Sequence, residues 1–276
     1  MLVLAGLALA LLLWAVVVEP RSLRVETHEF TLSRWPAVCD GLRVAVLADL
    51  HVGSPFNGLD KLDAIVDLTR QAQPDLVLLA GDYVIQGVAG GRFAPPEEAA
   101  RALGRLDARL GVWAVLGNHD WWLDARRVQS ALESSGIRVL EDAAVQVHAE
   151  SCAFWLVGIG DFWEGRHDIP RALSQVTDVS PVVAFTHNPD VFPDVPARVA
   201  LTIAGHTHGG QVYLPFVGRP VVPSRFGQRY AFGHVVEAGR HLFVSTGLGT
   251  SIMPVRFLVP PEISILVLRS EDAEAD

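Results

Sequence analysis

Along the chain, short apolar segments alternate with segments whose apolar residues recur at helical spacing. Segments 42–48, 76–80 and 112–116 are largely apolar and predict buried strands. Helices are predicted between and after them, over 59–71, 97–110 and 124–134. Further strands are predicted at 137–140, 144–149, 153–159, 182–186, 200–204, 242–245 and 263–268. A βαβαβ first half followed by a β-dominated second half predicts an α/β domain with packed sheets.

The chain begins with an uncharged run, Leu2 to Val18, that consists of apolar residues and Gly. As a helix it would be roughly 25 Å long, the short end of what crosses a bilayer core. A cleaved signal peptide would have a basic start and a small-residue cleavage site, whereas Glu19, Pro20 and Arg21 follow this run. A buried core helix would be the third alternative, but no polar residue marks a solvent face. We therefore predict a single-pass membrane anchor over residues 1–20.

The basic residues near this run all follow it, at Arg21, Arg24, Arg34 and Arg43. By the positive-inside tendency, they place the large C-terminal part on the cytoplasmic side of the membrane. We expect residues 21–42 to form a connector with a candidate first strand. Residues 43–269 should form the main domain, and residues 270–276 a solvated acidic tail.

Composition excludes some classes of protein. The net charge is −9, and the chain has one lysine and no arginine-rich run, so no nucleic-acid partner is expected. Half of the residues are apolar, which suffices for a core without disulfides. The two cysteines, Cys39 and Cys152, lie in no CxxC or Cys/His cluster and predict neither a disulfide framework nor a structural zinc site. The sequence leaves the oligomeric state open.

Metal-binding side chains stand at the ends of five predicted strands. They are Asp49 and His51, then Asp82, then Asn118, His119 and Asp120, then His187, and finally His206 and His208. Because ligands of α/β sheets gather at the carboxyl ends of strands, we expect these side chains to converge. Alone, Gly81-Asp82 is typical of a turn, and Asp-x-His or a single His after a strand is common by chance. The blocks that contain Asn118 and His206 are rarer. The combination of carboxylate, amide and imidazole without thiolate in the five blocks suits Mn, Fe, Zn, Co or Ni.

Five blocks of this sequence resemble the signature blocks of the calcineurin-like metallophosphoesterases. They are Asp49-x-His51, Gly81-Asp82, Gly117-Asn118-His119-Asp120, His187 and Gly205-His206-Thr207-His208. The resemblance extends from about residue 43 to 268. It implies a four-layer α-β-β-α sandwich of two mixed sheets flanked by helices, preceded here by one N-terminal apolar helix. The blocks continue as Thr186-His187-Asn188-Pro189-Asp190 and His208-Gly209-Gly210-Gln211. With the apolar run, they are similar to the bacterial membrane-associated phosphodiesterase branch, which includes the chlamydial type of UDP-2,3-diacylglucosamine pyrophosphatase.

The resemblance implies two divalent metal ions, with manganese favoured. One ion would be held by Asp49, His51, Asp82 and His208, and the other by Asp82, Asn118, His187 and His206. A hydroxide shared by the ions would attack phosphorus. His119 would protonate the leaving group, and Asp120 would orient His119.

The activity expected from the resemblance is hydrolysis of a phosphodiester or pyrophosphate bond. We expect a lipid-linked substrate such as UDP-2,3-diacylglucosamine, because the aromatic pairs Trp121-Trp122 and Phe162-Trp163 could form an apolar rim for acyl chains. Arg225 and Arg229 could clamp a second phosphate. Core packing of the aromatic pairs and surface positions for the arginines are the alternatives. The competing functions are a tethered phosphodiesterase without lipid preference and a non-catalytic scaffold with the same fold.

Overall fold

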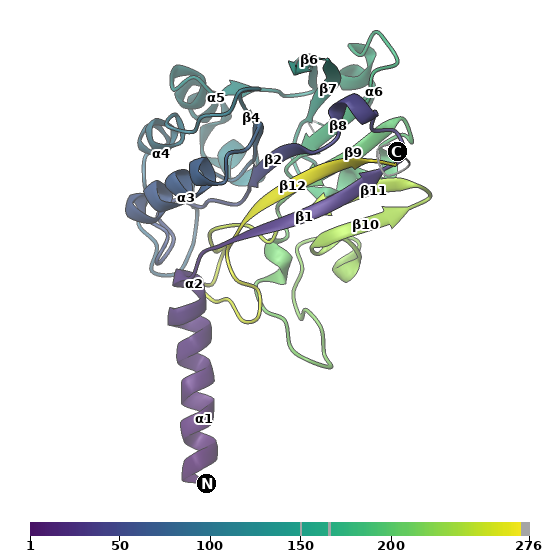
Figure 1. Ribbon diagram of the computed structural model, residues 1–276. Helices are drawn as coiled ribbons and strands as arrows, with labels where there is room; N and C mark the ends of the chain where they lie inside the picture. The colour runs from purple at the N-terminus through teal and green to yellow at the C-terminus, as the bar shows by residue number, and fades with distance from the viewer. Residues whose placement is uncertain (150, 165–166, 272–276) are drawn as a thin grey trace.

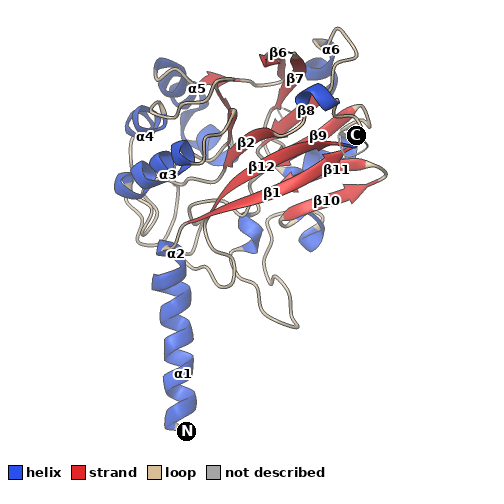
Figure 2. Ribbon diagram, viewed as in Figure 1, coloured by secondary structure: helices blue, strands red, loops and turns tan. Residues whose placement is uncertain are grey.

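Two six-stranded mixed sheets face each other, and helices cover their outer faces (Figures 1 and 2). The structure is a computed structural model that describes residues 1–149, 151–164 and 167–271. The predicted α/β sandwich with flanking helices is confirmed. Most of the predicted acidic tail, from residue 272 onward, lies outside the described residues.

The first sheet has the strand order β1-β12-β2-β3-β4-β5. Its strands are Arg24–Leu32 (β1), Leu42–Leu47 (β2), Leu76–Ala80 (β3), Val112–Val115 (β4), Arg138–Val139 (β5) and Glu262–Ser270 (β12). Only the pairing of β12 with β2 is antiparallel among these strands. The candidate first strand is present as β1, which pairs along its whole length with β12. The first sheet thus begins at Arg24, inside the stretch predicted as a connector with a candidate first strand.

The second sheet has the strand order β10-β11-β9-β8-β7-β6. Its strands are Ala143–Ala149 (β6), Cys152–Ile159 (β7), Val182–Thr186 (β8), Val199–Ala204 (β9), Gly233–Glu237 (β10) and Arg240–Val244 (β11). The pairs β6–β7 and β10–β11 are antiparallel, and the central pairs are parallel. The prediction missed β10 because this edge strand has no buried residue and therefore no continuous apolar run.

Helices α3 (Leu59–Gln71), α4 (Pro96–Leu103) and α5 (Asn118–Ser134) cover the first sheet, and α6 (Ile169–Ser174) packs on the second. Short helical turns complete the fold, at η2 (Ala37–Cys39), η3 (Pro189–Asp194), η4 (His208–Gly210) and η5 (Gly227–Tyr230). Two predicted helix bounds were wrong. Helix α4 ends at Leu103, and the residue that follows, Gly104, has low helix propensity. Helix α5 has an additional first segment from Asn118, which follows the cap Gly117, and its backbone is kinked at Asp124, where the predicted helix begins.

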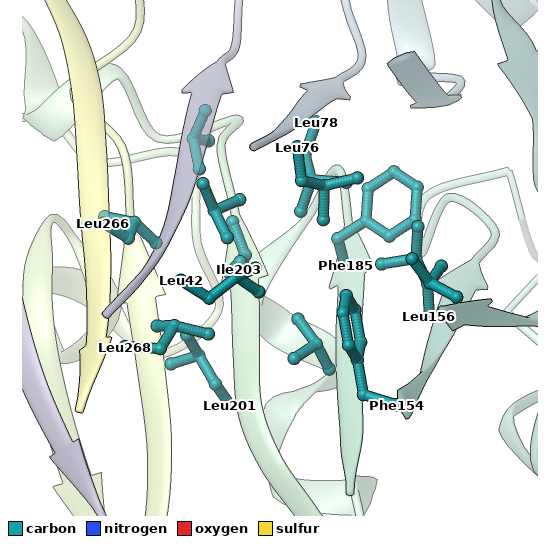
Figure 3. Packing of buried hydrophobic residues seen from close by; sticks show 14 of the residues in the cluster. Leu42, Leu76, Leu78, Phe154, Leu156, Phe185, Leu201, Ile203, Leu266 and Leu268 are labelled. Atoms are coloured by element: carbon teal, nitrogen blue, oxygen red, sulfur yellow. The ribbon is translucent and has the colours of Figure 1, made fainter. Parts of the chain in front are cut away.

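The core between the sheets is built from inward-facing side chains of both sheets, among them Leu42, Leu78, Phe154, Phe185 and Leu201 (Figure 3). Cys39 and Cys152 belong to the same core and form a disulfide that joins η2 to β7, with Cα atoms 4.9 Å apart. No disulfide framework was predicted for these two cysteines, and the structure adds this single bond. The two residues are 113 positions apart, and only the packing of the two sheets makes them neighbours.

The N-terminal segment forms one projecting helix from Leu2 to Arg21, made of α1 (Leu2–Leu13), a π-helical turn η1 (Trp14–Val18) and α2 (Glu19–Arg21) (Figure 1). It is long and apolar enough to cross a membrane, and α1 has no buried residue. Its end is packed against the sandwich. The carboxylate of Glu19 is buried and accepts hydrogen bonds from the backbone N–H groups of Leu258 and Val259. The predicted anchor boundary at residue 20 thus falls inside the packed part of the chain.

Candidate active site

The five strand ends meet at one edge of the sandwich, where β2, β3, β4, β8 and β9 present their carboxyl ends. Five of the predicted metal ligands adopt left-handed backbone conformations, with φ between 40° and 69°: Asp49, His51, Asp82, His206 and His208. Such conformations cost on the order of 1–3 kcal/mol each in residues other than Gly. They turn the chain sharply at the strand ends, so that the side chains point to a common centre instead of alternating.

The first group of ligands is Asp49, His51, Asp82 and His208, all buried. The Nε2 atoms of His51 and His208 lie 3.1 Å apart. Nε2 of His51 is 3.5 Å from Oδ2 of Asp82, and Nε2 of His208 is 3.5 Å from Oδ1 of Asp49. Two atoms bound at ~2.1 Å to one ion stand about 3.0–3.4 Å apart. The three separations, 3.1, 3.5 and 3.5 Å, lie inside or at the upper edge of this range, as expected for ligands of one metal ion.

The second group is Asp82, Asn118, His187 and His206. Nε2 of His187 lies 3.2 Å from Oδ2 of Asp82, 3.2 Å from Oδ1 of Asn118 and 3.1 Å from Nδ1 of His206. Oδ2 of Asp82 thus belongs to both groups. The structure brings together all seven predicted ligands, in the two sets that the sequence resemblance implied, with Asp82 between them.

The histidine rings are held in the orientation that a metal requires. Nδ1 of His51 donates a hydrogen bond to the carbonyl of Val84, and Nδ1 of His187 donates to the carbonyl of Ala80. Each ring therefore directs the lone pair of Nε2 into the centre. Burial lowers the pKa of His51 to about 4 and that of His206 to about 3, which keeps these rings neutral and able to bind metal.

Asp82 supplies the negative charge of the centre. Burial alone would raise its pKa, but attraction and hydrogen bonding from His187 hold the pKa well below its usual value. In turn, Asp82 raises the pKa of His187 to about 10 against the effect of burial. Burial raises the pKa of Asp49 to about 7. A divalent metal would replace the proton on Asp49 and on His187.

His119 lies beside the two groups in the first turn of α5. Its ring is 4.7 Å from the ring of His51 and 4.8 Å from the ring of Trp122. Burial lowers the pKa of His119, although Asp82 opposes this shift. Its backbone N–H donates to Oδ1 of Asp82, so the residue is tied to the centre through its main chain.

The resemblance implied that Asp120 orients His119, but the carboxylate of Asp120 bonds other groups. Instead its Oδ2 accepts hydrogen bonds from the N–H groups of Asp82 and Gly117, and its Oδ1 accepts from the N–H of Tyr83. In a helical turn, consecutive side chains point about 100° apart, which separates Asp120 from the His119 ring. Asp120 is thus a positioning residue for the loop that carries Asp82.

A cavity of about 660 Å³ opens next to these residues. Its polar side contains Asp82, Asn118, His119, His206 and His208. Its apolar side is formed by Trp122, Trp163, Val212, Pro220, Val221, Pro223, Ile252, Met253 and Val255. The segments around 212–223 and 251–255 were missed by the sequence analysis because they contain no polar motif. The signal that could have found them is the near absence of charge in two long loops.

Of the four predicted substrate contacts, Trp122 lines the cavity, whereas Trp121, Arg225 and Arg229 are not among its lining residues. Nε1 of Trp122 donates to Glu164, whereas Trp121 packs against the core under the helices of the first sheet. The guanidinium of Arg225 lies 4.0 Å above the ring of Phe162, and that of Arg229 is paired with Glu237 at 2.6 Å.

Comparison with known proteins bears on the nature of this centre. A family model of the calcineurin-like phosphoesterases matches residues 42–210, more than half of the chain. The chain belongs to the calcineurin-like phosphoesterase family. This phosphoesterase is accordingly a hydrolase, and the resemblance found in its sequence is confirmed.

The relatives of this phosphoesterase include three with informative names. It is 33% identical over 232 residues to "Phosphodiesterase YaeI" of Escherichia coli, across 82% of each chain. It is 27% identical to "UDP-2,3-diacylglucosamine pyrophosphatase LpxG" of Chlamydia trachomatis, across 92% of this chain and 91% of that one. It is 29% identical to "Transmembrane protein with metallophosphoesterase domain" of Danio rerio, across 89% of this chain and 57% of that protein.

Proposed function

We propose that this protein is a dinuclear metal-dependent phosphoesterase that hydrolyses phosphodiester or pyrophosphate bonds. The observation that carries the proposal is the pair of ligand groups that share Oδ2 of Asp82. The donor set of carboxylates, one amide and neutral imidazoles suits divalent ions such as manganese. The names of the bacterial relatives, a phosphodiesterase and a pyrophosphatase, are consistent with both bond types.

The residues of the centre have separate tasks in this proposal. When bound, two divalent ions supply a nucleophilic hydroxide near neutral pH and neutralise charge on the phosphoryl oxygens. Asp82 fixes the spacing of the two positions. His119 lies on the cavity side and donates a proton to the leaving oxygen. Without substrate, burial lowers the pKa of His119. The negative oxygens of a bound phosphate ester raise this pKa again, so that the ring carries a proton when substrate is bound.

The test is hydrolysis of bis-p-nitrophenyl phosphate by the full chain with added Mn²⁺, before and after chelation. His119→Asn should abolish most turnover while two metals stay bound, whereas Asp82→Asn should lower the content of both metals. Elemental analysis of the two purified variants gives the metal content. A folded protein that is inactive with every first-row divalent metal would instead be a non-catalytic scaffold.

We propose a lipid-linked substrate, such as a UDP-diacylglucosamine, for this centre. Support comes from the apolar side of the cavity, where the rings of Trp122 and Trp163 lie 6.2 Å apart, and from the projecting apolar helix. Trp122→Ala should raise KM for a diacylated substrate more than for a small soluble diester. A tethered phosphodiesterase without lipid preference would show equal changes with both substrates.

We further propose that the helix from Leu2 to Arg21 is a single-pass membrane anchor. Its α1 residues are exposed on all sides, as a helix in contact with lipid would be. The arginines that follow it favour a cytoplasmic domain, whereas the disulfide favours an oxidising compartment. These two indications make opposite predictions, which a labelling experiment separates.

A further inference from the structure

Two loops next to the projecting helix expose apolar side chains and almost no charge. They comprise residues 212–223, between β9 and β10, and residues 250–261, which precede β12. The only charged residues in these loops are Arg219 and Arg256, and both are buried. The large apolar residues that are at least 50% exposed are Phe216, Val217, Val221, Ile252, Met253 and Leu258. Phe216 is fully exposed and Ile252 is 71% exposed, which is costly in water for groups of this size.

Hydrogen bonds join the two loops to the helix. The backbone N–H of Arg256 donates to the carbonyl of Ala15 at 2.9 Å, within the run from Leu2 to Val18. The first loop is joined to the second by a β-bridge between Val212 and Phe257. Because Ala15 belongs to the apolar run, a membrane that holds this run also reaches the loops. Figure 1 shows both loops extending from the sandwich toward the same side as the helix.

The buried arginines explain how these loops avoid presenting charge to lipid. Arg256 directs its guanidinium inward, where it donates hydrogen bonds to the carbonyls of Thr246, Gly247, Gly249 and Val259. The guanidinium of Arg219 lies 3.9 Å above the ring of Phe232. Lipid is a poor solvent for free cations and for unpaired backbone groups, and here the cations are satisfied inside the protein.

We propose that Phe216, Val217, Val221, Ile252, Met253 and Leu258 form a docking surface that inserts into the interfacial region of a phospholipid bilayer. This proposal rests on the membrane anchor proposed above. The docking surface is continuous with the helix, and it fixes the orientation of the sandwich relative to the bilayer. An anchor with a flexible linker would not do this.

The docking surface also determines how a substrate enters. Val221, Ile252 and Met253 belong to the docking surface and line the catalytic cavity at the same time. The mouth of the cavity therefore opens at the bilayer interface. A phosphoester carried by a membrane lipid would reach the metal centre by lateral movement, with its acyl chains still in the bilayer. The substrate class that fits this arrangement is a phosphodiester or pyrophosphate whose leaving or retained group is a lipid.

The test places an environment-sensitive fluorophore at single introduced cysteines of the full chain in phosphatidylcholine vesicles that contain a doxyl-labelled quencher lipid. The positions are Val217, on the docking surface, and Val179, an equally apolar and fully exposed residue between α6 and β8. Leu9, in the helix, reports on the anchor. The parent chain, treated with the same label, gives the background from Cys39 and Cys152. We expect loss of emission at Val217→Cys and Leu9→Cys, and unchanged emission at Val179→Cys.

Quenching at Leu9→Cys without quenching at Val217→Cys would overturn the docking surface and leave the anchor intact. If crosslinking through Val217→Cys joined two chains in that case, the surface would be an interface with a second copy. An absence of quenching at both positions would overturn the anchor and the docking surface together.

A second measurement uses activity. The double substitution Phe216→Ser and Val217→Ser should lower hydrolysis of a vesicle-borne phosphodiester and leave hydrolysis of bis-p-nitrophenyl phosphate unchanged, and the control Val179→Ser should change neither rate. Equal losses with both substrates would mean that the loop is structural and would refute docking. A parent chain that is inactive toward both substrates refutes the proposed function, while the fluorescence result still decides whether the loops dock.

Discussion

The glycine that precedes α5 offers a sharp test of the metal centre. A Cβ atom added to Gly117 would lie 2.2 Å from Oδ1 of Asp82 and 2.6 Å from the backbone nitrogen of Asp82. Ordinary contacts of a Cβ begin at 3.4 Å, so the carboxylate shared by the two ligand groups would have to move by about 1 Å. The backbone at Gly117, with φ −100° and ψ 174°, accepts any residue. Gly117→Ala therefore adds no backbone strain, and it acts through the steric displacement and the loss of a glycine helix cap.

A displacement of about 1 Å at a catalytic centre costs on the order of 100-fold in rate. We expect Gly117→Ala to lower kcat/KM for bis-p-nitrophenyl phosphate by about this factor, with a parallel loss of bound metal. The measurement is steady-state hydrolysis with Mn²⁺, combined with elemental analysis and a thermal melt that reports on folding.

Gly58→Ala is the matched control. Gly58 precedes α3 in the same way that Gly117 precedes α5, and its φ of −82° is also open to any residue. No atom of the described residues lies within 4 Å of the Cβ that would be added there. Both substitutions replace a glycine cap by alanine, so their effects on helix capping should match. Activity of Gly117→Ala within about threefold of Gly58→Ala would refute the shared position of Asp82.

Two further predictions concern buried charges away from the ligands. Burial raises the pKa of Glu141 from 4.5 to about 8, so the folded chain binds a proton there that the unfolded chain releases. The free energy of unfolding should therefore fall as the pH rises from about 5 to 8, by at most about 1.4 kcal/mol per pH unit. Glu141→Gln should remove this part of the pH dependence, which thermal melts across that pH range would measure. Arg256→Leu should lower the free energy of unfolding by at least about 2 kcal/mol, because the carbonyls of Thr246 and Gly249 lose their donor. A melt of Arg256→Leu equal to that of the parent would contradict this.

The parts of the fold that could be predicted are those with continuous apolar runs and clear ends. Strands β3 and β8 and helix α3 have the predicted bounds. The apolar pattern is interrupted by Gly81 after β3, by His187 after β8, and by Pro74 and its neighbours after α3. The candidate metal ligands could be selected from the sequence because each block follows such a strand. Parallel strands place their carboxyl ends at one edge, so sequence position alone indicated proximity.

What could not be predicted depends on side-chain direction and distant packing. Asp120 follows His119 directly, yet its carboxylate bonds the loop of Asp82, because the first turn of α5 directs the two side chains apart. The docking surface has no motif, and its residues became a surface only when two loops met the helix at Ala15 and Glu19. Apolar runs in a sequence are ordinarily assigned to the core. Exposure, and not composition, identifies these loops as different.

The disulfide leads to a final prediction, on the side of the membrane that the sandwich faces. Cys39 and Cys152 are both buried in the core between the sheets, and their bond closes a long loop of chain. Structural disulfides persist in oxidising compartments and are rare in the cytosol. We therefore expect the sandwich to face the oxidising side, opposite to the orientation predicted from Arg21 and its neighbours.

After denaturation, Cys39 and Cys152 should react with maleimide only if a reductant is first added. In intact cells, Val179→Cys should react with an impermeant maleimide added from outside. Alkylation of both native cysteines without reduction, together with labelling of Val179→Cys only after lysis, would restore the cytoplasmic orientation, because the thiols would then be free in a reducing compartment.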